Sequence, residues 1–438
     1  MKISEFQLRI ISKIFMVIFF ISTQIAQGSE EAGKVFTLDE SIKTALENNW
    51  SVKAVEERIS ESEYAEKEVK AGFYPELSMS YSYTRLGDEP TVGNIVVGDK
   101  NSFQWKGTVT QPIFTGYALT SAHELAKLGV DQSKAGLELK KLDLALKVKQ
   151  AYFNILKADK SVNVAKSAVE SLEAHRALAQ NFYDVGMTPV NDLLKAEVEL
   201  ANAQHNYTRA QNEAKYARLS FNVLLSRTVD ESLAIEDILI YNPETADYEV
   251  YQNKALKARP EMKSLNLTDA QIDQQIKLSK SRYYPEAAFT FDYIKEGDTP
   301  LVSGSDFQDA NSWQASVGLS WTFWNWDKTK NSVRQNESNK RQLYETKKTL
   351  EDSIRLELKK AILDLKEAEE KIPAAKKAVN QAEENLRVSE ERYKVQATTS
   401  TEVLDAQTLL SQARMNYYNA LYDHNLAKAR LLRAVGEY

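Results

Sequence analysis

Cysteine is absent from the 438-residue chain, which excludes disulfide bonds, thiol catalysis and cysteine-ligated metals. Histidine is scarce: the four histidines are scattered along predicted helices, and none pairs with another at the spacing of a metal site. The sequence also lacks a glycine-rich phosphate loop and a nucleophile elbow. It therefore offers no catalytic, metal or cofactor site, and we do not expect an enzyme. The histidines are His123, His175, His205 and His424.

An excess of basic charge is also lacking. The chain has 56 lysines and arginines against 62 aspartates and glutamates, which gives a formal net charge of -6. These charges are spread along the predicted helices and do not gather into the basic patch that nucleic acid requires. We therefore expect no nucleic acid partner.

Long apolar runs are scarce, and the one near the N-terminus is short. Residues 14–21 are apolar, follow three basic residues, and precede a stretch of small residues that ends at Gly28. This order predicts a signal peptide over residues 1–28. An uncleaved membrane anchor is the alternative, but the run is shorter than the roughly 20 residues that span a bilayer.

Helical sequence, in contrast, is abundant. Residues 117–183 contain no proline, and at about 1.5 Å per residue such a helix would extend roughly 100 Å. Apolar residues recur from Leu144 to Tyr183 in strict steps of four and three, with Arg176 as the one polar member. This heptad seam predicts a left-handed coiled coil.

The same seam recurs from Ile354 to Tyr393, 210 residues further along the chain. The chain is therefore interpreted as a tandem duplication. We place the first repeat at residues 29–225, a linker at 226–250 and the second repeat at 251–438.

In each repeat we expect a helix, two strands, a long helix and a return helix. Thr188 is expected to cap the first return helix with Pro189 as its first residue, and Pro373 should kink the second long helix. The shorter helices, stacked end to end, match the long helix in length. The predicted strands are 77–85, 103–114, 287–293 and 312–323, and the predicted helices are 38–72, 117–184, 190–225, 326–394 and 401–434.

The predicted strands alternate apolar, often aromatic, side chains with small polar ones. Strands of this length with one apolar face are typical of a transmembrane β-barrel, although a soluble sheet has the same pattern. Four strands cannot enclose a lumen, and open sheet edges cannot face lipid. A trimer would supply twelve strands. The expected fold is thus a mixed α and β membrane protein, a trimeric 12-stranded outer-membrane β-barrel continued by a 12-helix periplasmic α-barrel.

The duplicated order and several motifs resemble the TolC-like outer-membrane efflux proteins over essentially the whole mature chain. The most specific motif is the helical turn that occurs once in each repeat. The residues that carry the resemblance are Ala45, Leu46, Asn48, Tyr74, Pro75, Gln111, Pro112, Ile113, Phe114, Gly116, Tyr183, Val185, Gly186, Asp192 and Leu194 in the first repeat, and Tyr393, Val395, Val403, Leu404 and Asp405 in the second.

The resemblance implies a homotrimer in the outer membrane of a Gram-negative bacterium, with a periplasmic extension. Such a protein is the exit duct of a tripartite efflux pump or a type I secretion system. Its partners are a periplasmic adaptor protein, an inner-membrane pump and outer-membrane lipid, and substrates pass through it without chemistry. The competing hypothesis is a periplasmic coiled-coil scaffold or adaptor, because adaptors also carry helical hairpins. Adaptors usually have one hairpin, whereas here the hairpin is duplicated and follows aromatic strands.

The two helical turns are expected to lie at the periplasmic end, where they would form the adaptor contact. They consist of Val185, Gly186, Met187, Thr188 and Pro189 in the first repeat, and Val395, Gln396, Ala397, Thr398 and Thr399 in the second.

Beside these turns, Glu402 and Asp405 are three residues apart and share one helix face. Three copies could place their carboxylates in one constriction that selects cations. The alternative is a capping box between Thr399 and Glu402. The resemblance favours an acidic gate, and it implies that Asp192 and Tyr393 can be joined by a hydrogen bond that closes the tip. A solvated Asp192 and a seam Tyr393 are the alternative.

Two positions depart from the family pattern. Thr398 stands where some relatives have a basic latch residue, and Gln396 replaces the glycine found at Gly186. The expected membrane girdle, for which ordinary sheet packing is the alternative, consists of Tyr81, Tyr83, Phe103, Trp105, Trp313, Trp321 and Phe323.

Overall fold

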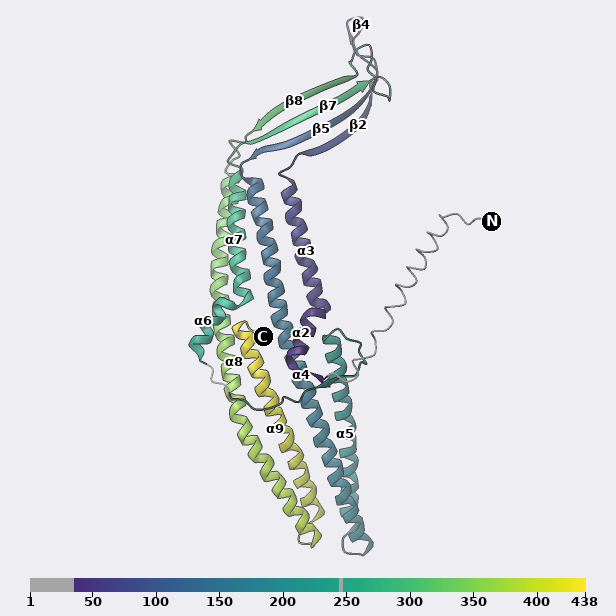
Figure 1. Cartoon of the computed structure of the whole chain (residues 1–438), viewed down its shortest axis with the longest axis vertical. Helices are drawn as coiled ribbons and strands as arrows, with labels where there is room; N and C mark the ends of the chain where they lie inside the picture. The colour runs from purple at the N-terminus through teal and green to yellow at the C-terminus, as the bar shows by residue number, and fades with distance from the viewer. Residues whose placement is uncertain (1–34, 244–246) are drawn as a thin grey trace, which may run out of the picture.

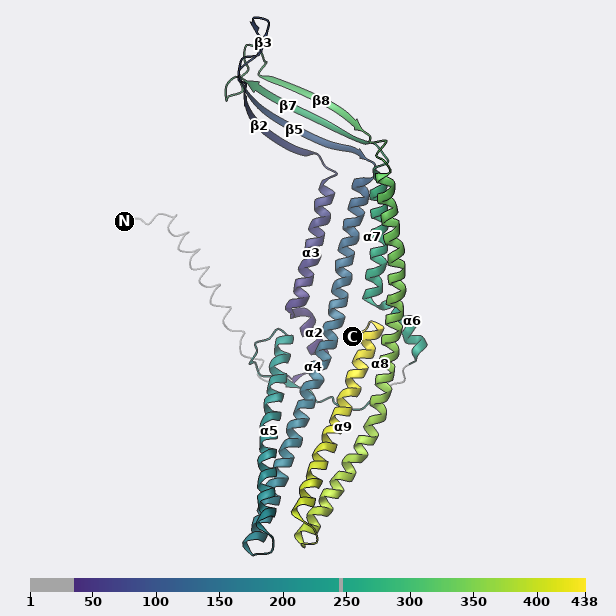
Figure 2. The ribbon, with the colours of Figure 1, turned by 180° about the vertical axis from the view of Figure 1, so that it is seen from behind.

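The computed structural model describes residues 35–243 and 247–438. The predicted signal peptide, residues 1–28, lies outside this part of the chain. A four-stranded sheet occupies one end of an elongated molecule, and two helical hairpin turns lie at the other end (Figure 1). Between them the helices form a slab, and the view from behind gives the same order (Figure 2). No helix among the described residues is both long and apolar enough to cross a bilayer.

The sheet combines one β-hairpin from each repeat. Its strand order is β2-β5-β7-β8, and all neighbours are antiparallel. The strands are β2 (Glu76–Arg85), β5 (Asn101–Thr115), β7 (Glu286–Gly297) and β8 (Asn311–Ser320), and the first hairpin loop carries the small pair β3 (Thr91–Val92) and β4 (Ile95–Val96).

The fourth strand is shorter than the sequence predicted. β8 ends at Ser320, so Trp321 and Phe323 lie in the connection to the next helix. The indole Nε1 of Trp321 donates a hydrogen bond to the carbonyl oxygen of Tyr283 at 3.1 Å. This bond ties the connection to the turn before β7 instead of continuing the strand.

The helices of the two repeats match closely in length. The long helices α4 (Ala118–Asp184) and α8 (Lys328–Lys394) have 67 residues each, and α8 runs through Pro373 without a break. The return helices are α5 (Val190–Leu224) and α9 (Ser400–Val435). The remaining helices are α2 (Leu38–Asn48), α3 (Trp50–Ala71), α6 (Tyr248–Ala258) and α7 (Pro260–Ser281).

The prediction of one continuous helix over residues 38–72 was wrong. The chain leaves the helical conformation at Asn49, where ψ is 125°, and at Arg259, its counterpart in the second repeat, where ψ is 129°. The Asn49 side-chain amide donates to the carbonyl oxygen of Leu224 at 2.8 Å, and Arg259 Nη1 lies 3.5 Å from the carbonyl oxygen of Ala434. Each break residue therefore binds the C-terminal end of the return helix stacked beneath it.

The predicted seam forms the core of the helical slab. Leu144, Val148 and Ile155 are buried in the first repeat, as are Ile354 and Leu358 in the second. At the far end the repeats differ: the side chain of Tyr183 is 41% exposed and that of Tyr393 only 2%. The second hairpin thus buries its last seam residue and the first does not.

At mid-height, two very short strands tie the start of the described chain to the linker. β1 (Val35–Phe36) pairs in parallel with β6 (Ala234–Ile235). The hydroxyl of Tyr152 on α4 bridges this pair, because it lies 3.1 Å from the carbonyl oxygen of Phe36 and 2.8 Å from that of Glu236. Burial raises the pKa of Tyr152 to about 12.

Candidate functional site at the helical tips

The two predicted turns form the tips of the hairpins, side by side at the end opposite the sheet (Figure 1). In the first tip, the N–H of Gly186 donates to the carbonyl of Tyr183 at 2.9 Å, and the N–H of Met187 donates to that of Phe182 at 2.8 Å. These two bonds define a Schellman motif, and Gly186 takes the required left-handed conformation with φ of 74°.

The second tip has the same motif without a glycine. The N–H groups of Gln396 and Ala397 donate to the carbonyls of Tyr393 and Arg392 at 2.9 and 2.8 Å. Gln396 has φ of 60°, a conformation that costs a residue with a Cβ atom about 1 kcal/mol. Arg392 Nη2 adds a bond to the carbonyl of Ala397 at 3.1 Å and braces this turn.

The caps of the return helices differ from the prediction. Pro189 occupies the N-cap position of α5, one residue before the helix, and the Thr188 hydroxyl has no hydrogen-bond partner among the described residues. Thr399 is the N-cap of α9, but its side chain makes no capping hydrogen bond. The capping box that would explain Glu402 locally is therefore not formed.

A buried polar contact joins the two hairpins just above the tips. His175 on α4 is 7% exposed, and its Nε2 lies 2.7 Å from the hydroxyl oxygen of the fully buried Ser400 on α9. The Ser400 hydroxyl also lies 3.5 Å from the carbonyl oxygen of Asp192 on α5. The imidazole packs against the ring of Tyr393 on α8, with ring centroids 4.8 Å apart. Four helices thus meet at one histidine.

The electrostatics of this contact favour the neutral imidazole. Burial lowers the pKa of His175, and the carboxylate of Asp192 opposes that effect. Burial, and after it the charge of Asp192, raise the pKa of the Tyr393 hydroxyl. The Tyr393 hydroxyl has no hydrogen-bond partner in the described part of the chain. The expected hydrogen bond between this hydroxyl and Asp192 is therefore not made within one chain, and the Tyr393 ring packs in a cluster with Leu386.

Glu402 and Asp405 are both exposed on the first turns of α9. Neither has an ion-pair partner among residues 35–243 and 247–438. Their counterparts 210 positions earlier are Asp192 and Lys195, so the acidic position at the start of the return helix occurs in both repeats. Lys195 Nζ lies 3.1 Å from the Thr401 hydroxyl of the neighbouring hairpin. The first turns of the two return helices therefore carry exposed charges, of which Glu402 and Asp405 are not neutralised by the described residues.

Apolar side chains at the tips are also exposed. Val185 is 67% exposed, Met187 56% and Val395 74%. Exposed apolar residues on a loop, beside unpaired charges, are typical of a protein contact.

At the other end of the molecule, the sheet has one apolar face, and its residues on the edge strands β2 and β8 are exposed. The register places Met79 opposite Gly107, Gly107 opposite Tyr293, and Tyr293 opposite Trp313. Residues directly opposite one another share a face. Met79 is 72% exposed and Trp313 69%.

The predicted girdle residues on the strands lie on this apolar face. Tyr81 pairs with Trp105, and Tyr83 pairs with Phe103. The rings of Tyr83 and Phe103 are stacked, with centroids 4.5 Å apart. Trp321 and Phe323 lie beyond the strand. An ion pair that was not predicted lies on the opposite, polar face, where Lys106 Nζ is 3.0 Å from an Asp292 carboxylate oxygen.

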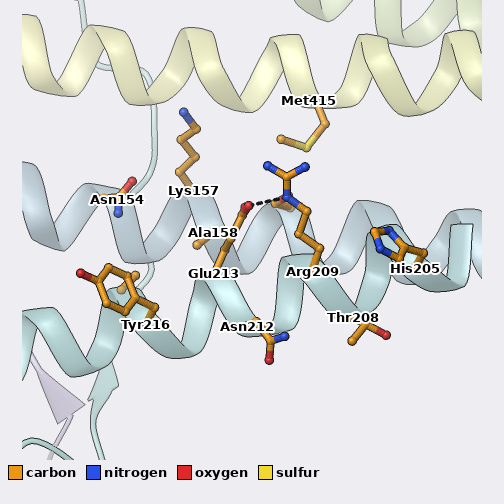
Figure 3. A pocket seen from close by; sticks show the side chains of 12 residues that line it. Asn154, Lys157, Ala158, His205, Thr208, Arg209, Asn212, Glu213, Tyr216 and Met415 are labelled. Carbon is orange, nitrogen blue, oxygen red and sulfur yellow. Dashed lines mark hydrogen bonds and ion pairs between the residues drawn. The ribbon is translucent and has the colours of Figure 1, made fainter. Parts of the chain in front are cut away.

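A groove runs along the lower half of α4, with α5 on one side and α9 on the other (Figure 3). One section has a volume of about 810 Å³ and the next about 580 Å³, and both are lined by Arg209, Glu213 and Met415. Arg209 Nε donates to Glu213 at 2.9 Å, and Lys157 and Met415 extend into the space between α4 and α9 (Figure 3). A long groove with this mixed lining suits a helix of a partner protein better than a small ligand.

The sequence profile described as outer membrane efflux protein matches residues 41–226 and 252–437. The two matches correspond to the two repeats. No curated protein sequence is significantly similar to the chain.

Several solved structures have the same fold at low sequence identity. CusC, described in terms of folding and transmembrane channel formation, is 16% identical with a TM-score of 0.79, covering 92% of each chain. The outer membrane channel CmeC of Campylobacter jejuni is 17% identical with a TM-score of 0.78, covering 91% of this chain and 85% of its own. The open state of the outer membrane channel MtrE of Neisseria gonorrhoeae is 18% identical with a TM-score of 0.75, covering 91% of this chain and 89% of its own.

Proposed function

Since the chain belongs to the outer membrane efflux protein family, we propose that three copies assemble into one continuous exit duct. Their sheets close into a 12-stranded barrel in the outer membrane, and their helices form a 12-helix periplasmic tube. The duct serves a tripartite efflux pump or a type I secretion system. A periplasmic adaptor protein and an inner-membrane pump are its partners, and drugs, metal ions or proteins pass through it without chemistry.

The observation that carries this proposal is the uncovered sheet. All ten residues of each edge strand, β2 and β8, are exposed, whereas most residues of the inner strands β5 and β7 are half-buried. Backbone groups of an open edge cannot be left unpaired in lipid. Pairing β2 of one copy with β8 of the next satisfies both edges and turns the apolar face toward the membrane.

The helical slab has matching open edges. α5 and α8 lie at opposite sides of its lower half (Figures 1 and 2). The α5 edge exposes Val190, Leu194 and Val198 at intervals of four residues, and the α8 edge exposes Leu356 and Leu363 at an interval of seven. Closing the ring brings such edges together and removes their apolar side chains from water.

We place the gate and the adaptor contact at the tips. Three copies bring six carboxylates of Glu402 and Asp405 to one end of the tube, where they would favour cations. Their exposure and lack of ion pairs support this role. The exposed apolar tips and the groove along α4 offer the surface for adaptor helices.

Single-channel conductance in a planar bilayer tests the proposal directly. The mature chain, purified from outer membranes in mild detergent, should have the mass of a trimer and a small, cation-selective conductance. The double variant Glu402→Ala/Asp405→Ala should conduct more and lose cation selectivity. Glu57→Ala/Glu61→Ala is the matched control, because it removes two exposed carboxylates from one face of α3, and neither makes an ion pair among residues 35–243 and 247–438. It should leave both quantities unchanged.

A soluble monomer without conductance would contradict the channel and favour the periplasmic scaffold. A conducting trimer in which both double variants behave alike would contradict only the acidic gate.

A further inference from the structure

A pocket lies where the helices meet the sheet, between the start of α4 and the end of α7. Its volume is about 550 Å³, and its lining includes Tyr117 and Glu124 from the α4 side and Lys277, Lys280 and Tyr284 from the α7 side. If the sheet spans the membrane as proposed above, the pocket is level with the headgroups of the periplasmic leaflet. The inference below rests on that proposed function.

The pocket is shaped by an unusually close approach of two backbone segments. Gly116 and Tyr117 are both left-handed, with φ of 59° and 70°. A Cβ atom on Gly116 would lie 2.5 Å from the carbonyl oxygen of Ser281, so only glycine fits against the end of α7. The Tyr117 and Tyr284 rings meet edge to face, with centroids 5.6 Å apart. The tyrosine walls are therefore held in place by the backbone.

An aromatic path connects the pocket to the apolar face of the sheet. Phe114 pairs with Ala287, two residues before Phe289 on the apolar face of β7. The Phe114 ring meets Tyr117 edge to face at 5.5 Å, and Tyr117 meets Tyr284. An acyl chain lying on the apolar face can thus continue along Phe114 and Tyr117 to a headgroup in the pocket.

The pocket contains both signs of charge, and none of the three charged groups is neutralised by the protein. Lys277 and Lys280 make no ion pair within residues 35–243 and 247–438, and Glu124 likewise makes none. Two ammonium groups one helical turn apart suit a phosphate, whereas a carboxylate beside tyrosine rings suits a primary ammonium ion.

We propose that this pocket binds the phosphoethanolamine headgroup of a membrane phospholipid. Lys277 and Lys280 bind the phosphate, and Glu124 accepts hydrogen bonds from the ammonium group, which also faces Tyr117 and Tyr284. The acyl chains lie along Phe114 and the apolar face of the sheet.

The charge pattern distinguishes this headgroup from other common ones. Phosphatidylglycerol carries no ammonium, so it would leave Glu124 unpaired next to a bound phosphate. Phosphatidylcholine carries a quaternary ammonium that has no N–H group to donate to Glu124. Phosphatidylethanolamine alone of the three satisfies both sides of the pocket.

The test is lipid titration of the delipidated full-length mature protein in detergent, followed by native mass spectrometry. The titrants are phosphatidylethanolamine, phosphatidylglycerol and phosphatidylcholine with identical short acyl chains, together with O-phosphoethanolamine and inorganic phosphate. The variants are Lys277→Ala/Lys280→Ala and Glu124→Gln. Lys67→Ala/Lys70→Ala is the matched control, because these lysines stand 210 positions earlier, at the end of α3.

We expect phosphatidylethanolamine to bind best, with one tight site per chain. Lys277→Ala/Lys280→Ala should weaken its binding about tenfold. Glu124→Gln should remove the preference for phosphatidylethanolamine over phosphatidylcholine. The Lys67→Ala/Lys70→Ala variant should bind as the unaltered protein does, and the mass of the assembly should be the same for all.

Equal binding of the three lipids would overturn the proposal, as would equal losses in the two lysine variants. Binding of inorganic phosphate as tight as that of the lipid would identify a free anion as the ligand and overturn the lipid assignment. Short-chain lipids can reach the pocket in a monomer as well as in a trimer. Selective lipid binding by a protein that does not conduct would therefore contradict the proposed channel and support the proposed lipid site. A conducting trimer without lipid preference would reject the pocket alone.

Discussion

Exchanging the residues at the two tip turns should change local stability in opposite directions. A Cβ atom at Gly186 meets nothing within 4 Å, so the cost of Gly186→Gln comes from the left-handed backbone alone. That cost is about 1 kcal/mol. The reverse change, Gln396→Gly, relieves the same strain in the second tip. Glycine also makes the opened chain more flexible, which reduces the gain, so the net stabilisation should be about 0.5 to 1 kcal/mol.

Hydrogen exchange at single amides measures this local stability. The N–H of Met187 closes the first turn and that of Ala397 closes the second, each through a bond of 2.8 Å. In Gly186→Gln the Met187 amide should exchange about fivefold faster, and in Gln396→Gly the Ala397 amide should exchange about two to five times slower. The Val164 amide, in the middle of α4, should exchange at the same rate in both variants and serves as the control. Equal rates at Met187, or changes of the same sign in both variants, would refute the argument.

Three further predictions concern buried groups. Burial lowers the pKa of His175, so the folded tip binds a proton less tightly than the unfolded chain, whose histidine pKa is about 6.5. The tip should have its full stability above pH 6.5 and lose stability as the pH falls from there toward the lower pKa of the folded state. Hydrogen exchange at the tip amides, measured as a function of pH, checks this prediction. The variant His175→Gln should abolish the pH dependence. Tyr152→Phe leaves two carbonyl groups without their hydroxyl donor and should lower the free energy of unfolding in urea by about 1 to 2 kcal/mol. The Arg259 side chain is only 3% exposed and pairs with two carboxylates, so Arg259→Ala should lower the free energy of unfolding by about 3 kcal/mol in the same assay. Lys254→Ala removes one partner of an exposed pair and should cost less than about 1 kcal/mol.

Periodic features of the fold could be read from the sequence because they repeat locally. The seam from Ile354 to Tyr393 was predicted, and most of its members are buried. The alternating strands were predicted for the same reason, and the family resemblance is confirmed by the profile match. The break at Asn49 was missed, because its amide binds the carbonyl of Leu224, which is 175 residues away. Pro260 was a local signal for the equivalent break in the second repeat.

At the tips, too, features with a local sequence signal were predicted and those without one were not. The turns were placed correctly because Gly186 marks the first, and the duplication places Gln396 at the same position in the second. The contact between His175 and Ser400 could not be predicted, because 225 residues separate them and neither stands in a motif. The capping box between Thr399 and Glu402, which was the alternative to the acidic gate, does not form, because a threonine three residues before a glutamate permits this box without enforcing it. The inward orientation of Glu402 and Asp405 stays a prediction.

The matching helix lengths of the two repeats restrict how the length of the helical region can change. α4 and α8 each have 67 residues, and α5 and α9 have 35 and 36. An insertion in one long helix alone would slip its seam against the return helix and leave one tip longer than the other. Only additions of whole heptads, made together in all four helices, keep the seams in register and both tips level. The length of the helical slab can therefore change only as a unit.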